Sequence, residues 1–170
     1  MHRRESEADM AENRTACFFG HRTIEETEGL RYALLETIER LIVEEGVDTF
    51  LFGSRSEFDG LCLRLVSQLK EKHPHVKRIY LRAEYPYIDE AYKEWLLLRY
   101  DGTSFPERLL RAGRAVYVER NREMIQRSRY CIVYLDEEKA REKSSGTSLA
   151  LAYAEQRGRE IFRFTPESPK

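Results

Sequence analysis

Short apolar runs alternate along this chain with segments whose apolar residues recur at helical spacing. Residues 16–20 (ACFFG) and 49–53 (TFLFG) are apolar runs closed by glycine, and both predict buried strands. Four further runs predict strands at 76–81, 115–118, 130–135 and 160–164. Charged and apolar residues alternate within 76–81, which favours a place nearer the edge of a sheet.

Helices are predicted between these strands, where apolar residues recur every three or four positions. Two stripes are formed by Leu30, Leu34, Ile38, Leu41 and Ile42, and by Phe58, Leu61, Leu65 and Leu69. Further helices are expected at 88–100, around Met124 and Ile125, and along a face formed by Leu149, Ala150, Tyr153 and Ala154. Residues 101–113 carry no clear pattern, and we expect a loop there with a short helix at 106–113.

The repeated alternation of strand and helix predicts a single-domain α/β fold, Rossmann-like, with a mostly parallel sheet and helices on both faces. A chain of 170 residues with 41% hydrophobic residues suits one core. The domain is expected to span residues 15–165. Residues 1–14 are highly charged and are expected to form a flexible N-terminal segment, and 166–170 a loose C-terminal tail.

The charges of the chain nearly balance, with 29 Lys and Arg against 30 Asp and Glu, so no overall field attracts DNA or an anionic membrane. Nucleic acid is therefore not an expected partner, and the basic run of Arg108, Arg111 and Arg114 is interpreted as a solvated helix face. No apolar run is long enough to cross a membrane, and no signal peptide is apparent, so we expect a soluble cytoplasmic protein. The sequence is compatible with a monomer and with a homo-oligomer.

The cysteines and histidines give no sign of a metal or redox site. Cys17, Cys62 and Cys131 each lie among apolar neighbours and form no CxxC motif, so they are interpreted as small core residues. The four histidines show no ligand spacing. The sequence therefore predicts neither a metal site nor a cofactor.

Ligands of doubly wound sheets bind beyond the carboxyl ends of the strands, so the residues that follow each strand form the candidate site. Gly20, His21 and Arg22 follow the first run. Glycine permits a sharp turn, and Arg22 offers a planar cation to phosphate or carboxylate. The alternative is a simple turn with solvated histidine and arginine side chains.

The second run is followed by Gly53, Ser54 and, in the first turn of the next predicted helix, Asp59. Small residues here can donate backbone N–H groups to an anion, or Ser54 or Ser56 can simply cap the helix. A carboxylate at the position of Asp59 is favoured by the helix dipole whatever its function.

The stretch 144–148 (SSGTS) directly precedes the last predicted helix and is the strongest single signal. Ser145, Gly146 and Thr147 combine backbone donors, hydroxyl donors and the positive end of the helix dipole, which suits a phosphate. Capping of the helix by Ser145 is the alternative.

Two other strand ends carry candidate residues. Arg120 and Asn121 follow the run at 115–118, where they can contact an anion and a base or hydroxyl, or form a solvated helix start. Residues 85–87 (YPY) follow the run at 76–81. These tyrosines either line the cleft with aromatic rings or pack as buried side chains.

The motifs FGHR (19–22), GSRSEFD (53–59), RNREMIQRS (120–128) and SGT (145–147) follow the order and spacing of the YpsA-like branch of the SLOG superfamily. The chain resembles this family over residues 15–164. The resemblance implies a Rossmann-like fold and a pocket for nucleotides or nucleotide-derived ligands. It also implies that this pocket is lined by Gly20, His21, Arg22, Gly53, Asp59, Arg120, Asn121, Ser145, Gly146 and Thr147.

Two departures from related sequences bear on function. The second loop of the YpsA-like branch usually reads GGALGFD, and here Ser54 and Glu57 replace two of its glycines. The superfamily also contains the DprA proteins, which bind single-stranded DNA, and the Lonely Guy phosphoribohydrolases. The phosphoribohydrolases resemble PGGxGTxxE at the last loop, and Ala150 stands here where their catalytic glutamate would fall.

Three functions are consistent with these motifs: a nucleotide-binding or sensor protein, a hydrolase or transferase acting on a nucleotide N-glycosidic bond, and a DNA-handling protein. Glycosidic cleavage requires a positioned carboxylate, for which Asp59 and Glu119 are the candidates, and no catalytic residue is assigned. DNA handling requires a basic face with stacking aromatics, which the composition does not clearly supply. Binding of a phosphate-bearing, nucleotide-type small molecule is the favoured prediction.

Overall fold

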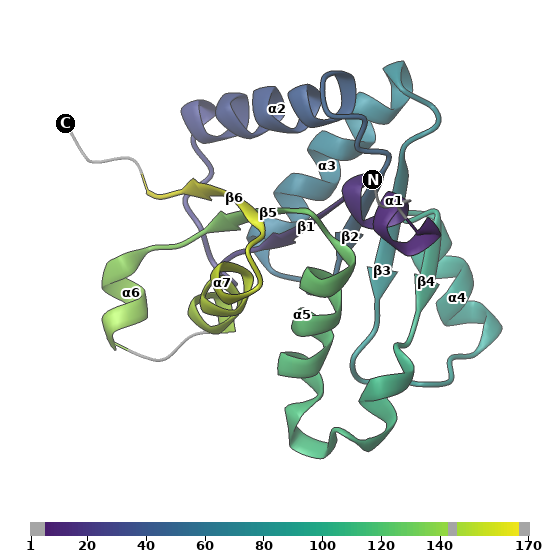
Figure 1. The fold of residues 1–170 in the computed structure, drawn as a ribbon. Coiled ribbons are helices and arrows are strands. Elements are labelled where there is room, and N and C mark those ends of the chain that lie inside the picture. The colour runs from purple at the N-terminus through teal and green to yellow at the C-terminus, as the bar shows by residue number, and fades with distance from the viewer. Residues whose placement is uncertain (1–5, 143–145, 167–170) are drawn as a thin grey trace, which may run out of the picture.

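A six-stranded, fully parallel sheet forms the centre of the computed structural model, which describes residues 6–142 and 146–166 (Figure 1). The strand order is β4-β3-β2-β1-β5-β6. The strands are β1 (Thr15–Phe19), β2 (Thr49–Phe52), β3 (Lys77–Leu81), β4 (Gly102–Ser104), β5 (Tyr130–Tyr134) and β6 (Glu160–Phe164). The predicted Rossmann-like α/β fold is confirmed.

Helices connect these strands on both faces of the sheet. The α-helices are α1 (Glu7–Asn13), α2 (Glu28–Val43), α3 (Glu57–Lys72), α4 (Glu90–Leu97), α5 (Val116–Arg127), α6 (Glu137–Glu142) and α7 (Gly146–Gln156). Two short 3-10 helices, η1 (Glu107–Arg111) and η2 (Gly113–Ala115), lead into α5. None of the helices in the described part of the chain has the length and apolar character needed to cross a membrane.

Alternate residues of the strands point to two separate apolar cores, one on each face of the sheet. Along β1, Phe18 points into the core shared with α2 and α3, whereas Cys17 points into the core shared with α5 and α7. Figure 1 shows these two helix pairs on opposite sides of the sheet. The apolar stripes predicted for α2 and α3 are buried as expected. All three cysteines are free and buried, so their predicted role as core residues is confirmed.

The strand predicted at 115–118 is wrong. Ala115 ends η2, and Val116 begins α5. The physical reason is that only four apolar residues are followed by a charged, helix-favouring run, and this helix buries Met124 and Ile125 against the sheet. Helix formation therefore extends back through the short apolar run.

The segment that carries no apolar pattern contains the edge strand β4, which pairs with β3. Its three residues are only half-buried, so no apolar pattern marks them. Polar contacts hold it instead, since Asp101 accepts a hydrogen bond from the Arg78 N–H (2.8 Å) and Thr103 Oγ1 donates to the carbonyl of Tyr80 (2.8 Å). The run at 76–81 forms β3, one strand from this edge, in agreement with its alternating pattern.

Helix α1 lies within the N-terminal segment that we expected to be flexible. It has a capping box, in which the Ser6 hydroxyl accepts from the Asp9 N–H and the Asp9 carboxylate accepts from the Ser6 N–H. Glu12 forms an ion pair with Arg159. None of its residues is buried, so polar contacts rather than an apolar stripe position this helix. The predicted tail beyond residue 166 lies outside the described residues.

Gly20 and Gly60 allow a matched test of packing at the end of β1. A Cβ atom at Gly20 would lie 2.3 Å from the ring of Phe58, whereas at Gly60, inside α3, the nearest atom would be 3.7 Å away. Gly20→Ala should therefore lower the free energy of unfolding by about 1–3 kcal/mol. Gly60→Ala should raise it by up to about 1 kcal/mol, because alanine favours a helix. Urea denaturation of both variants checks these opposite signs.

Candidate functional site

A cavity of about 940 Å³ lies beyond the carboxyl ends of the strands. Its walls come from the segments that follow β1, β2 and β3 and from the first turns of α5 and α7. In Figure 1, β3 and β4 point towards the lower edge of the sheet, where α5 also begins. Parallel strands bring these distant segments together because all their carboxyl ends meet at one edge.

Ten of the eleven predicted site residues line this one cavity. They are Gly20, His21, Arg22, Gly53, Ser54, Asp59, Arg120, Asn121, Gly146 and Thr147. The eleventh, Ser145, lies outside the described residues.

His21 joins the ends of two neighbouring strands. Its Nε2 accepts a hydrogen bond from the backbone N–H of Asp136 (2.8 Å), and its ring packs edge-on against Tyr134. Burial lowers the pKa of His21, and the charge of Lys139 adds to this effect. A neutral ring with its proton on Nδ1 fits the accepting role of Nε2, so His21 mainly positions the first loop.

Three backbone donors of the second loop are paired within the protein. The N–H of Ser54 donates to Asp59 Oδ2 (3.2 Å), and the N–H of Ser56 donates to Ser54 Oγ (3.3 Å). The N–H of Glu57 donates to the carbonyl of Arg22 (2.8 Å). Ser56 is the N-cap of α3, which agrees with the alternative that a serine of this loop caps the helix. These donors are therefore engaged, and the cationic side chains provide the more available anion contacts.

Glu57 ties the second loop to the first. Besides the bond from its N–H to Arg22, its carboxylate accepts a hydrogen bond from the N–H of Ile24 (2.8 Å). Glu57 is one of the residues that replace glycine in the YpsA-like pattern. The replacement adds a cross-link between the loops that a glycine could not form.

Asp59 is a buried acid in the wall of the cavity, with 3% of its surface exposed. Its Oδ1 is buried and has no hydrogen-bond partner among the described residues. Burial raises the pKa of Asp59 to about 6, although the hydrogen bond from Ser54 and the charge of Arg120 oppose the shift. Perturbed acids of this kind are characteristic of functional sites.

Arg120 lies across the end of β2 and is 8% exposed. A Cβ atom at Gly53 would come within 2.8 Å of Arg120 Nε and 2.6 Å of Met124 Sδ, so a larger residue there would displace these two side chains. The guanidinium donates to Asn121 Oδ1 (3.2 Å) and lies over the ring of Tyr117. Arg120 thus belongs to the second turn of α5 rather than to a loop after a strand.

The cavity lining described here contains four arginines against three carboxylates: Arg22, Arg55, Arg82 and Arg120 against Asp59, Glu84 and Asp89. Arg22 is exposed and forms no hydrogen bond or ion pair through its side chain with another described residue. This excess of arginines gives the lining a net positive charge, which suits an anionic ligand.

Sequence reasoning missed Arg55 and Arg82. Arg55 donates to the hydroxyl of Tyr92 (2.7 Å) and lies over the ring of Trp95. Arg82 donates to the carbonyl of Tyr85 (3.0 Å) and to Thr103 Oγ1 (3.0 Å). Arg82 lies one residue beyond β3 and Arg55 three residues beyond β2, and this position after a strand was the signal available in the sequence.

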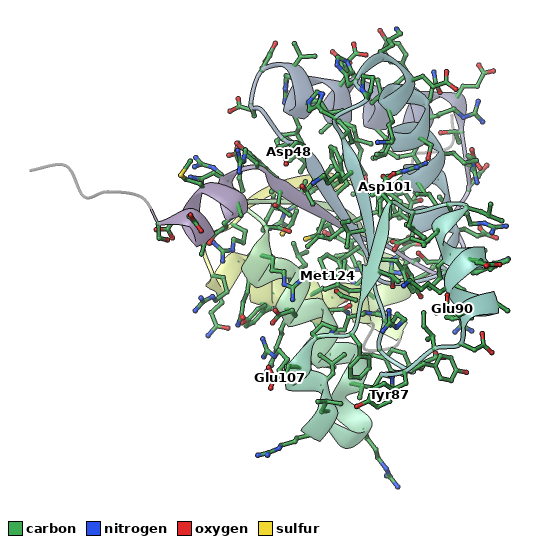
Figure 2. All side chains as sticks on the ribbon, turned by 90° about the vertical axis from the view of Figure 1, so that its right-hand side faces the viewer. Asp48, Tyr87, Glu90, Asp101, Glu107 and Met124 are labelled. Atoms are coloured by element: carbon green, nitrogen blue, oxygen red, sulfur yellow. The ribbon has the colours of Figure 1, made fainter. Side chains whose placement is uncertain are left out.

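Tyr85 and Tyr87 are exposed and line the cavity, so of the two alternatives for these tyrosines the buried one is wrong. They lie on the segment between β3 and α4, which spans the rim of the cavity rather than packing against the sheet. Figure 2 shows Tyr87 at the same end of the molecule as Glu90, where α4 begins, and Glu107, where η1 begins.

The first residues of α7, Gly146 and Thr147, line the cavity, whereas Ala150 packs in the core shared with α5. The prediction that Ala150 packs this helix against the sheet is confirmed. Glu119 forms salt bridges with Arg108 and Arg122 and does not line the cavity. Of the two candidate carboxylates, therefore, only Asp59 lies at the site.

Arg108 also pairs with Glu123, so the basic run at 108–114 is partly neutralised. No group of three or more His, Cys, Asp or Glu side chains that could hold a metal ion occurs within residues 6–142 and 146–166.

In the comparisons with known proteins, neither a protein-family model nor a curated protein matches this chain significantly.

The raised pKa of Asp59 predicts a pH-dependent stability. In the unfolded chain this carboxyl ionises near pH 4, whereas the folded protein holds the proton up to about pH 6. Stability is therefore lost as the pH rises through this window. Relative to Asp59→Asn, the free energy of unfolding of the wild type should fall by roughly 2 kcal/mol between pH 4 and pH 7.

Urea denaturation of both proteins at several pH values measures this difference. The asparagine oxygen can still accept the hydrogen bond from Ser54, so the comparison isolates the ionisation. A difference that does not change with pH would contradict the buried, poorly solvated state of Asp59.

Proposed function

We propose that this protein binds a nucleotide or nucleotide-derived, phosphate-bearing ligand in the cavity at the strand ends, as a member of the YpsA-like branch of the SLOG superfamily. The observation that carries the proposal is the convergence of cationic side chains, a helix start and an aromatic rim on one cavity of about 940 Å³. Ligand pockets of small molecules have volumes of roughly 300–1,000 Å³. A mononucleotide or a larger relative fits this range.

The phosphate is assigned to the end of the cavity formed by Arg22, Arg120 and the start of α7. Two guanidinium groups, one from the loop after β1 and one from α5, can give charge-assisted hydrogen bonds to phosphate oxygens. The backbone of α7 at Gly146 and Thr147 adds the positive end of a helix dipole. A Cβ atom at Gly146 would meet no atom within 4 Å, so there is open space beside this backbone.

Cleavage of a nucleotide N-glycosidic bond is the second candidate function, and Asp59 favours it. A carboxyl with a pKa of about 6 in a cavity wall can serve as a general acid or base. The buried position of Oδ1 argues against this role, because a catalytic group must reach the substrate within hydrogen-bonding distance. Binding without turnover is therefore the stronger candidate.

Mass spectrometry of small molecules released from the purified, heat-denatured protein tests the proposal directly, and titration calorimetry with AMP tests the phosphate contacts. Arg22→Ala should weaken AMP binding roughly ten- to hundredfold, because it removes a hydrogen bond to a charged group. Arg157→Ala is the matched control, since Arg157 is exposed just beyond the other end of α7. Equal affinity in both variants would remove Arg22 from the site.

We expect no release of free base or ribose 5-phosphate when the protein is incubated with nucleoside monophosphates. Chromatography of the products checks this expectation, with Asp59→Asn and Glu119→Gln as the paired variants. Base release that Asp59→Asn abolishes and Glu119→Gln retains would instead favour the hydrolase, with Asp59 as its acid or base.

A further inference from the structure

The segment between β3 and α4 crosses the rim of the cavity in a fixed conformation. Arg82, just after β3, donates to the carbonyls of Tyr85 (3.0 Å) and Pro86 (3.3 Å) and to Thr103 Oγ1 in β4 (3.0 Å). Three hydrogen bonds from one guanidinium thus fasten residues 85 and 86 to the edge of the sheet. The backbone that carries the aromatic side chains of this segment is therefore held in place.

The two tyrosines of the segment present different surfaces. Tyr85 is 54% exposed and packs edge-on against Tyr92 of α4, with ring centroids 6.2 Å apart. Tyr87 is 88% exposed and makes no ring contact or side-chain hydrogen bond with another described residue, although it lines the cavity. A large aromatic ring at a cavity mouth with no partner in the protein is available to a ligand.

A third tyrosine connects this rim to the opposite wall. The hydroxyl of Tyr117, in the first turn of α5, donates to Glu84 Oε1 (2.6 Å). The same ring lies beneath the guanidinium of Arg120, 5.5 Å from its centroid. The aromatic rim is therefore continuous with the cationic wall, so one ligand can contact both.

We propose that Tyr87, supported by Tyr85, is a stacking site for the planar base of the ligand, so that the cavity takes base-bearing nucleotides rather than sugar phosphates. This inference rests on the proposed nucleotide binding and adds the part of the ligand that the aromatic rim recognises. Stacking on an aromatic side chain is tolerant of base identity, because every base has a π-face. The rim therefore distinguishes nucleotides from phosphates without a base, and only weakly one base from another.

Titration calorimetry with AMP, GMP, CMP, UMP and ribose 5-phosphate tests this assignment. The wild type should bind the four nucleotides roughly ten- to hundredfold more tightly than ribose 5-phosphate. Tyr87→Ala should remove most of this ratio and leave the affinity for ribose 5-phosphate unchanged, whereas Tyr87→Phe should retain it. Tyr32→Ala is the control, because Tyr32 is 70% exposed on α2 and does not line the cavity.

The outcomes separate the two proposals. Equal affinity of the wild type for nucleotides and ribose 5-phosphate, or an unchanged ratio in Tyr87→Ala, would overturn the stacking site and leave phosphate binding intact. Absence of binding for all five compounds would overturn both. Loss of binding for all five in Tyr87→Ala would also overturn the assignment, because the residue would then support the whole site rather than the base.

Discussion

Helices α3 and α5 pack against the ends of β1 and β2 so closely that neither Gly20 nor Gly53 has room for a Cβ atom. The ring of Phe58 occupies the space beside Gly20, and Arg120 together with Met124 occupies the space beside Gly53. These two contacts fix where both helices lie relative to the sheet. Asp59 follows Phe58 directly, so its carboxyl is brought into the cavity wall by packing that involves no ligand. The inner surface of the site is thus a consequence of backbone approach at two glycines.

This close packing has an electrostatic consequence, because it buries an acid and a cation in the same wall. Asp59 and Arg120 influence each other's charge, yet no salt bridge joins these two described side chains. An unpartnered buried oxygen and a buried cation both disfavour folding. The separation of Asp59 and Arg120 therefore does not stabilise the folded state. Functional sites commonly retain such costs to stability.

The sequence predicted the parts of the fold that bury apolar side chains and missed those held by polar contacts. The runs at 16–20 and 130–135 form central strands, where burial on both faces gives a continuous apolar signal. The strand β4 and the helix α1 have no such signal, because hydrogen bonds and ion pairs hold them. In the site, residues in glycine and serine motifs were identified. Arg55 and Arg82 were missed because a single arginine in a loop carries no pattern, and only the fold shows which arginines face the cavity.

The aromatic rim and Arg22 differ in how firmly the protein holds them, which bears on selectivity. The backbone of the aromatic rim is fixed by three hydrogen bonds from Arg82, so the exposed ring of Tyr87 has only its two side-chain torsions left to order when a base stacks on it. Arg22, on the loop after β1, is exposed and unpaired among the described residues, so its longer side chain must lose more rotamer freedom when it contacts an anion. An aromatic ring on a fixed backbone binds a partner in few positions, whereas a flexible cation accepts several positions of negative charge. For a nucleotide in this cavity, the presence of a planar base would therefore be the stricter requirement, and the number and position of phosphates the more tolerant one.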